Sequence, residues 1–310
     1  MQLGILFSGQ GSQKPGMGLD FMSDPLFSEL ISAGSEDSHL DLAAIMASEH
    51  GELNKTKNVQ PALVAVSYGI YRMLQRDLLK MPVAAMAGLS LGEYGALMAS
   101  GALSVAEGLP LLADRGQYMQ DDADRVASAM VAVVDPELSI VKELLAKYDQ
   151  AWVANYNSPR QLVIGGVSDQ IRALAAELKD QQAAKRVVIL RVSGAFHTPL
   201  FNQAREKMHE RLRTVHFAEP KVPVISNTLV APFTADDLVP VMERQLAVPT
   251  HFGEDLQYMM DQQGVDATLE IGPGKTLTRF AKQVAPDAVH VHISKLKDYE
   301  KYVKEHQAWS

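Results

Sequence analysis

The chain has 310 residues, 47% of them hydrophobic, so it can bury the core of one large domain or two moderate ones. Its formal net charge of −8 argues against a nucleic-acid partner, because a nucleic-acid-binding face is basic. The sequence contains no cysteine, which excludes disulfides, zinc–thiolate sites and a cysteine nucleophile.

The first predicted element is a buried strand over residues 3–7, which ends in the glycine loop Ser8-Gly9-Gln10-Gly11-Ser12-Gln13. Sites of α/β proteins lie at the carboxyl ends of strands. A dinucleotide-binding loop is excluded, because the GxGxxG pattern would need a third glycine where Lys14 stands. The residues alone leave two interpretations open: a plain tight turn, or a loop that offers backbone N–H groups to an anionic oxygen.

The segment around Ser90 contains the most informative motif of the sequence. Residues 83–86 predict a short buried strand and residues 94–99 the start of a helix, with Gly88 and Gly92 flanking Ser90 between them. Gly-x-Ser-x-Gly is the spacing of a nucleophile elbow, a turn so tight that side chains two residues before and after the serine would collide. Ser90 would then stand at the edge of a sheet, above a helix N-terminus whose free N–H groups favour a developing oxyanion.

Two helices flank this turn in the sequence. Residues 61–74 predict a helix opened by Pro61 at its first position. Ser104 and Glu107 have capping-box spacing and predict a second helix that runs to about residue 119. Arg115 lies in this second helix, and taken alone it predicts an exposed surface charge.

Residues 125–196 follow a different pattern. Strands and helices are predicted in the order β-α-β-β-α-β, which is the split βαβ, or ferredoxin-like, unit. The predicted elements are strand 127–134, helix 136–147, strands 152–156 and 162–167, a helix from Ser168, and strand 186–192. This small unit would be inserted between two parts of a larger fold.

His197 follows the insertion, on a connection where a strand leads into a helix begun by Thr198 and Pro199 and ending near residue 215. A serine nucleophile needs a base, because its own pKa leaves it protonated. Of the nine histidines, His197 is the one placed where a base could face Ser90.

The remaining residues predict further strands and helices. They are strand 222–226, helices 236–245 and 253–262, strand 267–271, the turn Gly272-Pro273-Gly274-Lys275 and helix 276–283.

Several short motifs occur together in one order along the chain. They are Gly9-Gln10-Gly11-Ser12-Gln13, the Ser90 elbow, Arg115-Gly116, Phe196-His197 and Glu270-Ile271-Gly272-Pro273-Gly274. With them the chain resembles the malonyl-CoA:acyl-carrier-protein transacylases of bacterial type II fatty-acid synthesis, over essentially its whole length. The resemblance implies an α/β fold with an α/β-hydrolase-like core (residues 1–124 and 197–310) and an inserted ferredoxin-like subdomain (residues 125–196).

The resemblance also implies the chemistry. Ser90 would be the nucleophile and His197 its general base, and the backbone N–H groups of Gln10 and Leu91 would form the oxyanion hole. The malonyl group would pass from coenzyme A to Ser90, and then to the phosphopantetheine thiol of the acyl carrier protein. Both thioesters are substrates, so no cofactor and no metal would be needed.

Further roles follow from the same resemblance. Arg115 would pair with the free carboxylate of the malonyl group, which reverses the surface-charge interpretation. The main-chain carbonyl of Gln245 would orient His197 in place of an aspartate, and Asn155 and Asn157 would hold the geometry of the site. One departure is Leu89, because the family usually has histidine directly before the nucleophile.

The resemblance leads to expectations about specificity and partners. Phe196 and Leu91 are similar to the residues of malonyl-selective members. We expect a cytoplasmic monomer that binds malonyl-CoA and acyl carrier protein and contacts neither nucleic acid nor membrane, because no apolar run is long enough to span one. Lys179, Lys185 and Arg186 could dock the carrier protein.

Three alternative functions remain open from the sequence. One is a serine hydrolase or thioesterase, which would be expected to place an acid between Ser90 and a later histidine. Another is the malonyl transferase subunit of a malonate decarboxylase complex, which shares these motifs. The third is a catalytically silent module that binds carrier protein, which the presence of both Ser90 and His197 disfavours.

Overall fold

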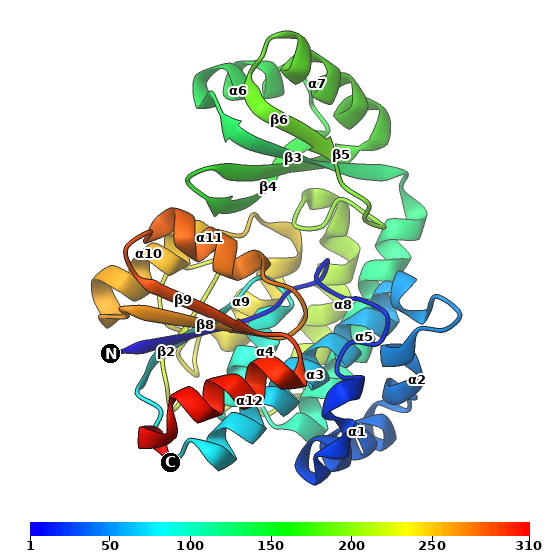
Figure 1. The fold of residues 1–310 in the computed structure, drawn as a ribbon. Coiled ribbons are helices and arrows are strands. Elements are labelled where there is room, and N and C mark those ends of the chain that lie inside the picture. Colours follow the sequence, from blue (N-terminus) through cyan, green and yellow to red (C-terminus); the bar gives the residue numbers. More distant parts are fainter.

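Two separate β-sheets organise the protein, which a computed structural model describes over all residues 1–310 (Figure 1). The larger sheet has the strand order β7-β2-β1-β8-β9, and every neighbouring pair in it is parallel. Its strands are β1 (Leu3–Phe7), β2 (Val83–Gly88), β7 (Val224–Ile225), β8 (Ala267–Ile271) and β9 (Val289–Ile293). Parallel neighbours need long crossover connections, which here contain the helices.

Helices cover both faces of the parallel sheet. They are α1 (Pro25–Ser38), α2 (Leu42–Ala47), α3 (Thr56–Asp77), α4 (Gly92–Ala99), α5 (Val105–Arg125), α8 (Asn202–Leu212), α9 (Leu238–Arg244), α10 (Phe252–Gln263), α11 (Thr276–Val284) and α12 (Leu296–Glu305). Figure 1 shows α10 and α11 on one face of the sheet, with α3, α4 and α12 on the other.

The central strand β1 shows why the sheet is covered twice. All five of its residues are buried. Ile5 and Phe7 belong to the large core shared with α3 and α4, whereas Leu6 belongs to a second core that contains Phe252 of α10 and Phe280 of α11. Successive side chains of a strand point to opposite faces, so a strand buried on both faces reads as a continuous apolar run.

The second sheet is antiparallel, with the strand order β4-β5-β3-β6. Its elements follow one another as β3 (Ser128–Pro136), α6 (Leu138–Leu145), β4 (Ala151–Ser158), β5 (Gln161–Val167), α7 (Ser168–Asp180) and β6 (Ala184–Ile189). The predicted order of elements is confirmed. The boundaries drawn between the two subdomains stay a prediction.

The two faces of this small sheet have different neighbours. Val131 and Val133 of β3 pack in a separate core with α6 and α7, whereas Met130 and Ala132 join the large core of the rest of the chain. The sheet therefore lies with one face under its own helices and the other toward the parallel sheet, as Figure 1 shows at the top of the molecule.

Several predicted boundaries were wrong, three of them at elements that border the site. Helix α3 begins at Thr56, so Pro61 lies inside it rather than at its first position; buried Val59 and Gln60 extend the helix backward. The helix predicted from Pro199 begins with the 3₁₀ turn Pro199–Phe201, and α8 ends at Leu212. Strand β6 ends at Ile189 instead of residue 192, because the chain leaves the sheet there to line a cavity.

No helix has both the length and the apolar character needed to cross a membrane.

Candidate active site

Ser90 lies on the predicted turn between β2 and α4. Its φ of 52° falls in the left-handed region, where a residue with a side chain is strained. A Cβ on Gly88 would overlap the backbone of Gly92, and a Cβ on Gly92 would overlap the carbonyl oxygen of Phe7. The predicted requirement for glycine at both positions is thus confirmed by the local geometry.

Two backbone donors beside this turn are unused. The N–H groups of Gln10 and Leu91 make no hydrogen bond within the chain, although most buried backbone groups are paired. The glycine loop lies directly on the elbow, since a Cβ on Gly9 would overlap the carbonyl oxygen of Leu89. Free donors next to a serine are what a developing oxyanion requires.

Arg115 is buried, with 1% of its surface exposed, so the surface-charge interpretation is wrong. Its guanidinium donates to the side-chain oxygen of Gln60 at 2.8 Å, to that of Gln245 at 2.9 Å and to Ser90 Oγ at 3.4 Å, and it lies over the Tyr94 ring. No carboxylate lies within 4.0 Å to form an ion pair with it. The site therefore contains a desolvated cation held only by neutral groups, which leaves it able to pair with an anion.

His197 is buried and has a φ of 62°. Its Nδ1 lies 2.8 Å from the main-chain oxygen of Gln245. A carbonyl only accepts hydrogen bonds, so Nδ1 carries the proton and Nε2 has the free lone pair. Burial, with a smaller contribution from Arg115, lowers the pKa of His197 to about 4, which keeps the ring neutral at pH 7. Ser90 and His197 line the same cavity, but no hydrogen bond joins them.

Gln245, in the 3₁₀ turn Gln245–Ala247, connects these groups. Its main-chain oxygen holds His197, and its side-chain oxygen accepts from Arg115. Its side-chain nitrogen donates to the Ser90 main-chain oxygen at 3.1 Å and to Glu93. One residue thus fixes the histidine, the arginine and the serine relative to one another.

Several polar residues of the site were missed by the sequence interpretation. They are Gln60, Glu93, Asn227 and Asp255, all fully buried. Glu93 accepts the Asn227 backbone N–H at 2.6 Å, and burial raises its pKa to about 7. One signal could have found Asn227, which lies two residues after β7, at the carboxyl edge of the sheet where sites occur.

The cavity has a volume of about 490 Å³ and lies between the two sheets. Ser90, Arg115 and His197 line it, and so do Asn155 and Asn157 of β4. Asn155 donates to Thr250 Oγ1 at 2.7 Å, and Asn157 donates to the side-chain oxygen of Gln161 at 2.9 Å. This volume falls in the range of binding sites for small molecules.

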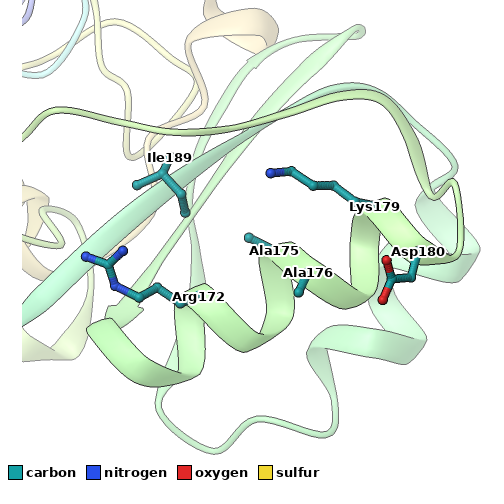
Figure 2. Close-up of a pocket in the computed structure, with 6 residues that line it drawn as sticks. All are labelled: Arg172, Ala175, Ala176, Lys179, Asp180 and Ile189. Carbon is teal, nitrogen blue, oxygen red and sulfur yellow. The ribbon is translucent and has the colours of Figure 1, made fainter.

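A second hollow, of about 370 Å³, lies on the outer side of the small sheet. Figure 2 shows Arg172 and Lys179 extending from α7 toward the strand that carries Ile189, with Ala175 between them. It contains no nucleophile and no base, so it is not the active-site cavity. Docking of a carrier protein by Lys179, Lys185 and Arg186 stays a prediction.

The sequence model of the acyl transferase domain family matches residues 5–300. The chain therefore belongs to the acyl transferase domain family. It is 35% identical over 289 residues to the malonyl CoA-acyl carrier protein transacylase of Escherichia coli (strain K12), an alignment that covers 91% of this chain and 93% of the relative.

Solved structures show the same fold. MCAT from Streptococcus pneumoniae superposes with a TM-score of 0.91 at 36% identity, covering 98% of this chain and 100% of the other. A malonyl-transacylase solved in complex with its type II polyketide acyl-carrier protein superposes with a TM-score of 0.92 at 29% identity, covering 98% of this chain and 100% of that one. The mixed α/β fold, with one parallel and one antiparallel sheet, is thus shared with the malonyl transacylases.

Proposed function

We propose that this protein is a malonyl-CoA:acyl-carrier-protein S-malonyltransferase that works through a malonyl ester on Ser90. The observation that carries the proposal is the buried guanidinium of Arg115, which has no ion-pair partner and lies 3.4 Å from Ser90 Oγ. A malonyl group bound at Ser90 would bring its free carboxylate to this cation. An acyl group without a carboxylate would leave the cation uncompensated.

In the first half-reaction, His197 Nε2 takes the proton from Ser90 Oγ, which attacks the thioester carbonyl carbon of malonyl-CoA. The carbonyl oxygen becomes an oxyanion, and the unused N–H groups of Gln10 and Leu91 are the proposed donors to it. When the intermediate collapses, the C–S bond breaks, His197 returns the proton to the leaving sulfur, and coenzyme A departs.

The second half-reaction repeats these steps with another thiol. The phosphopantetheine thiol of the acyl carrier protein gives its proton to His197 and attacks the ester carbonyl of malonyl-Ser90. The C–O bond then breaks, His197 returns the proton to Ser90 Oγ, and the malonyl group leaves as the thioester of the carrier protein. Because the Arg115–carboxylate pair holds the ester in one orientation, water is poorly placed to replace the thiol.

The histidine geometry favours a transferase over a serine hydrolase with an acid in its triad. Nδ1 of His197 meets a main-chain carbonyl rather than a carboxylate. We further propose that the larger part of the chain is an α/β-hydrolase-like core with the 125–196 segment as a ferredoxin-like subdomain. Fatty-acid or polyketide synthesis in the cytoplasm would provide the carrier protein.

Mass spectrometry of the protein mixed with malonyl-CoA tests the proposal. We expect a malonyl adduct on the peptide that contains Ser90, and loss of that adduct when a holo acyl carrier protein is added. Ser90→Ala should form none. An adduct that persists in Ser90→Ala would contradict the nucleophile assignment, and steady release of coenzyme A without an acceptor would indicate a hydrolase.

The pH dependence of acylation provides a second test. The base must be neutral, and burial lowers the pKa of His197 to about 4 from its usual 6.5. Going down in pH, kcat/KM for malonyl-CoA should therefore stay level through pH 6 and fall only as pH 4 is approached, because kcat/KM reports groups of the free enzyme. Circular dichroism at each pH serves as the folding control. A fall centred near pH 7 would instead point to Glu93, whose pKa is about 7.

A further inference from the structure

The side chain of Asn227 forms hydrogen bonds with the backbone of the nucleophile turn at two points. Asn227 is fully buried and lies two residues after the end of β7. Its side-chain oxygen accepts the backbone N–H of Ser90 at 2.6 Å, and its side-chain nitrogen donates to the main-chain oxygen of Gly88 at 2.9 Å. These contacts lie on either side of Leu89, so a single amide spans the bend that places Ser90 Oγ in the cavity.

The orientation of this amide is set by a third group. Asp255 of α10 accepts from the Asn227 side-chain nitrogen through Oδ2 at 2.7 Å. Gly88 and Asp255 both present acceptors, whereas Ser90 presents a donor. Only one of the two amide orientations therefore satisfies all three partners, and turning the amide over would place its oxygen against two others.

Asp255 suits this task as a neutral acid. It is fully buried, it takes part in no salt bridge, and its Oδ1 has no partner in the chain. Burial, together with the nearby Glu93 and Glu254, raises its pKa well above the usual range. A protonated carboxyl can carry its hydrogen on Oδ1 and still accept from Asn227 through Oδ2.

We propose that Asn227 and Asp255 are positioning residues for the nucleophile: Asp255 fixes the direction of the Asn227 amide, and that amide holds the Ser90 backbone in its left-handed conformation. The proposal rests on the proposed function of Ser90. Asp255 lies 165 residues from Ser90 in the sequence, and the two hydrogen bonds of Asn227 link it to the Ser90 backbone, so the direction of Ser90 Oγ depends on it. Neither positioning residue lines the cavity.

Two matched substitutions at one position test the proposal. Asp255→Asn keeps a carbonyl oxygen that can accept from Asn227 and places an amide nitrogen where Oδ1 lacks a partner. Asp255→Leu has a similar size and cannot accept. The first readout is the second-order rate constant for labelling of Ser90 by a fluorophosphonate, followed by intact-mass spectrometry. The second is the split between kcat and KM for malonyl-CoA.

We expect Asp255→Leu to label ~10- to 10²-fold more slowly per folded molecule, because misplacing a reacting group by about 1 Å costs up to that much. Its kcat should fall with little change in KM, since Arg115 and the cavity are intact. Asp255→Asn should label near the wild-type rate. Wild-type labelling by Asp255→Leu with only a lower Tm would overturn the proposal, and so would equal slowing in both variants.

If Asp255→Leu does not fold, Asn227→Asp supplies the test. It keeps an acceptor for the Ser90 N–H but replaces the donor to Gly88 with an oxygen, so we expect slow labelling, and a wild-type rate would overturn the proposal. The probe also separates the two hypotheses, because a fluorophosphonate reacts with an activated serine whatever its acyl donor. A wild-type enzyme that is labelled at Ser90 but transfers no malonyl group would refute the proposed function, and the labelling comparison would still decide the positioning role.

Discussion

His197→Ala should lose ~10²- to 10⁴-fold in the rate of malonyl transfer while remaining folded, because this is the usual contribution of a general base. In the structure, this substitution removes the imidazole that would accept the proton of Ser90. The ring is held by one hydrogen bond from Nδ1 to the Gln245 main-chain oxygen, and no other histidine lines the cavity with Ser90. The measurement is the burst of coenzyme A released on mixing enzyme with malonyl-CoA.

His251→Ala is the matched control. His251 lies at the start of α10, where its Nδ1 is 2.8 Å from Glu254 and its ring stacks on Tyr156. It does not line the cavity, so its removal should leave the burst unchanged. If His251→Ala lost the activity and His197→Ala kept it, the base assignment would be wrong.

Arg115→Ala should reduce malonyl transfer roughly 30- to 3,000-fold. Leaving a desolvated carboxylate without its partner costs about 2–5 kcal/mol, and each ~1.4 kcal/mol is a factor of ten. Acetyl-CoA has no such carboxylate, so its transfer should change little or rise. The measurement is the ratio of kcat/KM for malonyl-CoA to kcat/KM for acetyl-CoA, in the wild type and the variant.

Arg125→Ala is the control for this substitution, because Arg125 ends the same helix with an exposed side chain, pairs with the buried Asp122 and does not line the cavity. Its ratio of kcat/KM for malonyl-CoA to kcat/KM for acetyl-CoA should equal that of the wild type. Equal slowing of both substrates in Arg115→Ala would mean that Arg115 supports the structure, for example by holding Gln60 and Gln245, rather than selecting malonyl.

The elbow could be predicted from the sequence because its requirements are local. Gly88 and Gly92 are within two residues of Ser90, and a Cβ on Gly88 would clash with Gly92 in the same turn, although a Cβ on Gly92 would clash with Phe7 of the neighbouring strand. The order of elements in the antiparallel sheet was predictable for a similar reason, since apolar periodicity and turn residues report on each segment separately.

The surroundings of Ser90 depend on contacts that no local pattern carries. Arg115 looks like a surface charge within its own helix, and only its approach to Gln60 and Gln245 explains its burial. The role of Arg115 therefore came from the resemblance. Asn227 and Asp255 were missed because their partners lie far away in the sequence, and neither belongs to a motif.

The positive φ angles of Ser90 and His197 connect reactivity to foldability. Each left-handed residue with a side chain costs ~1–2 kcal/mol, set against a total stability of ~5–15 kcal/mol for a typical protein. Glycine at either position would relax the backbone and favour the native state, yet it would remove the reacting group. Selection for higher thermal stability and selection for a higher catalytic rate would therefore act in opposite directions on the same two residues. The packing around them must supply the stability that they cost.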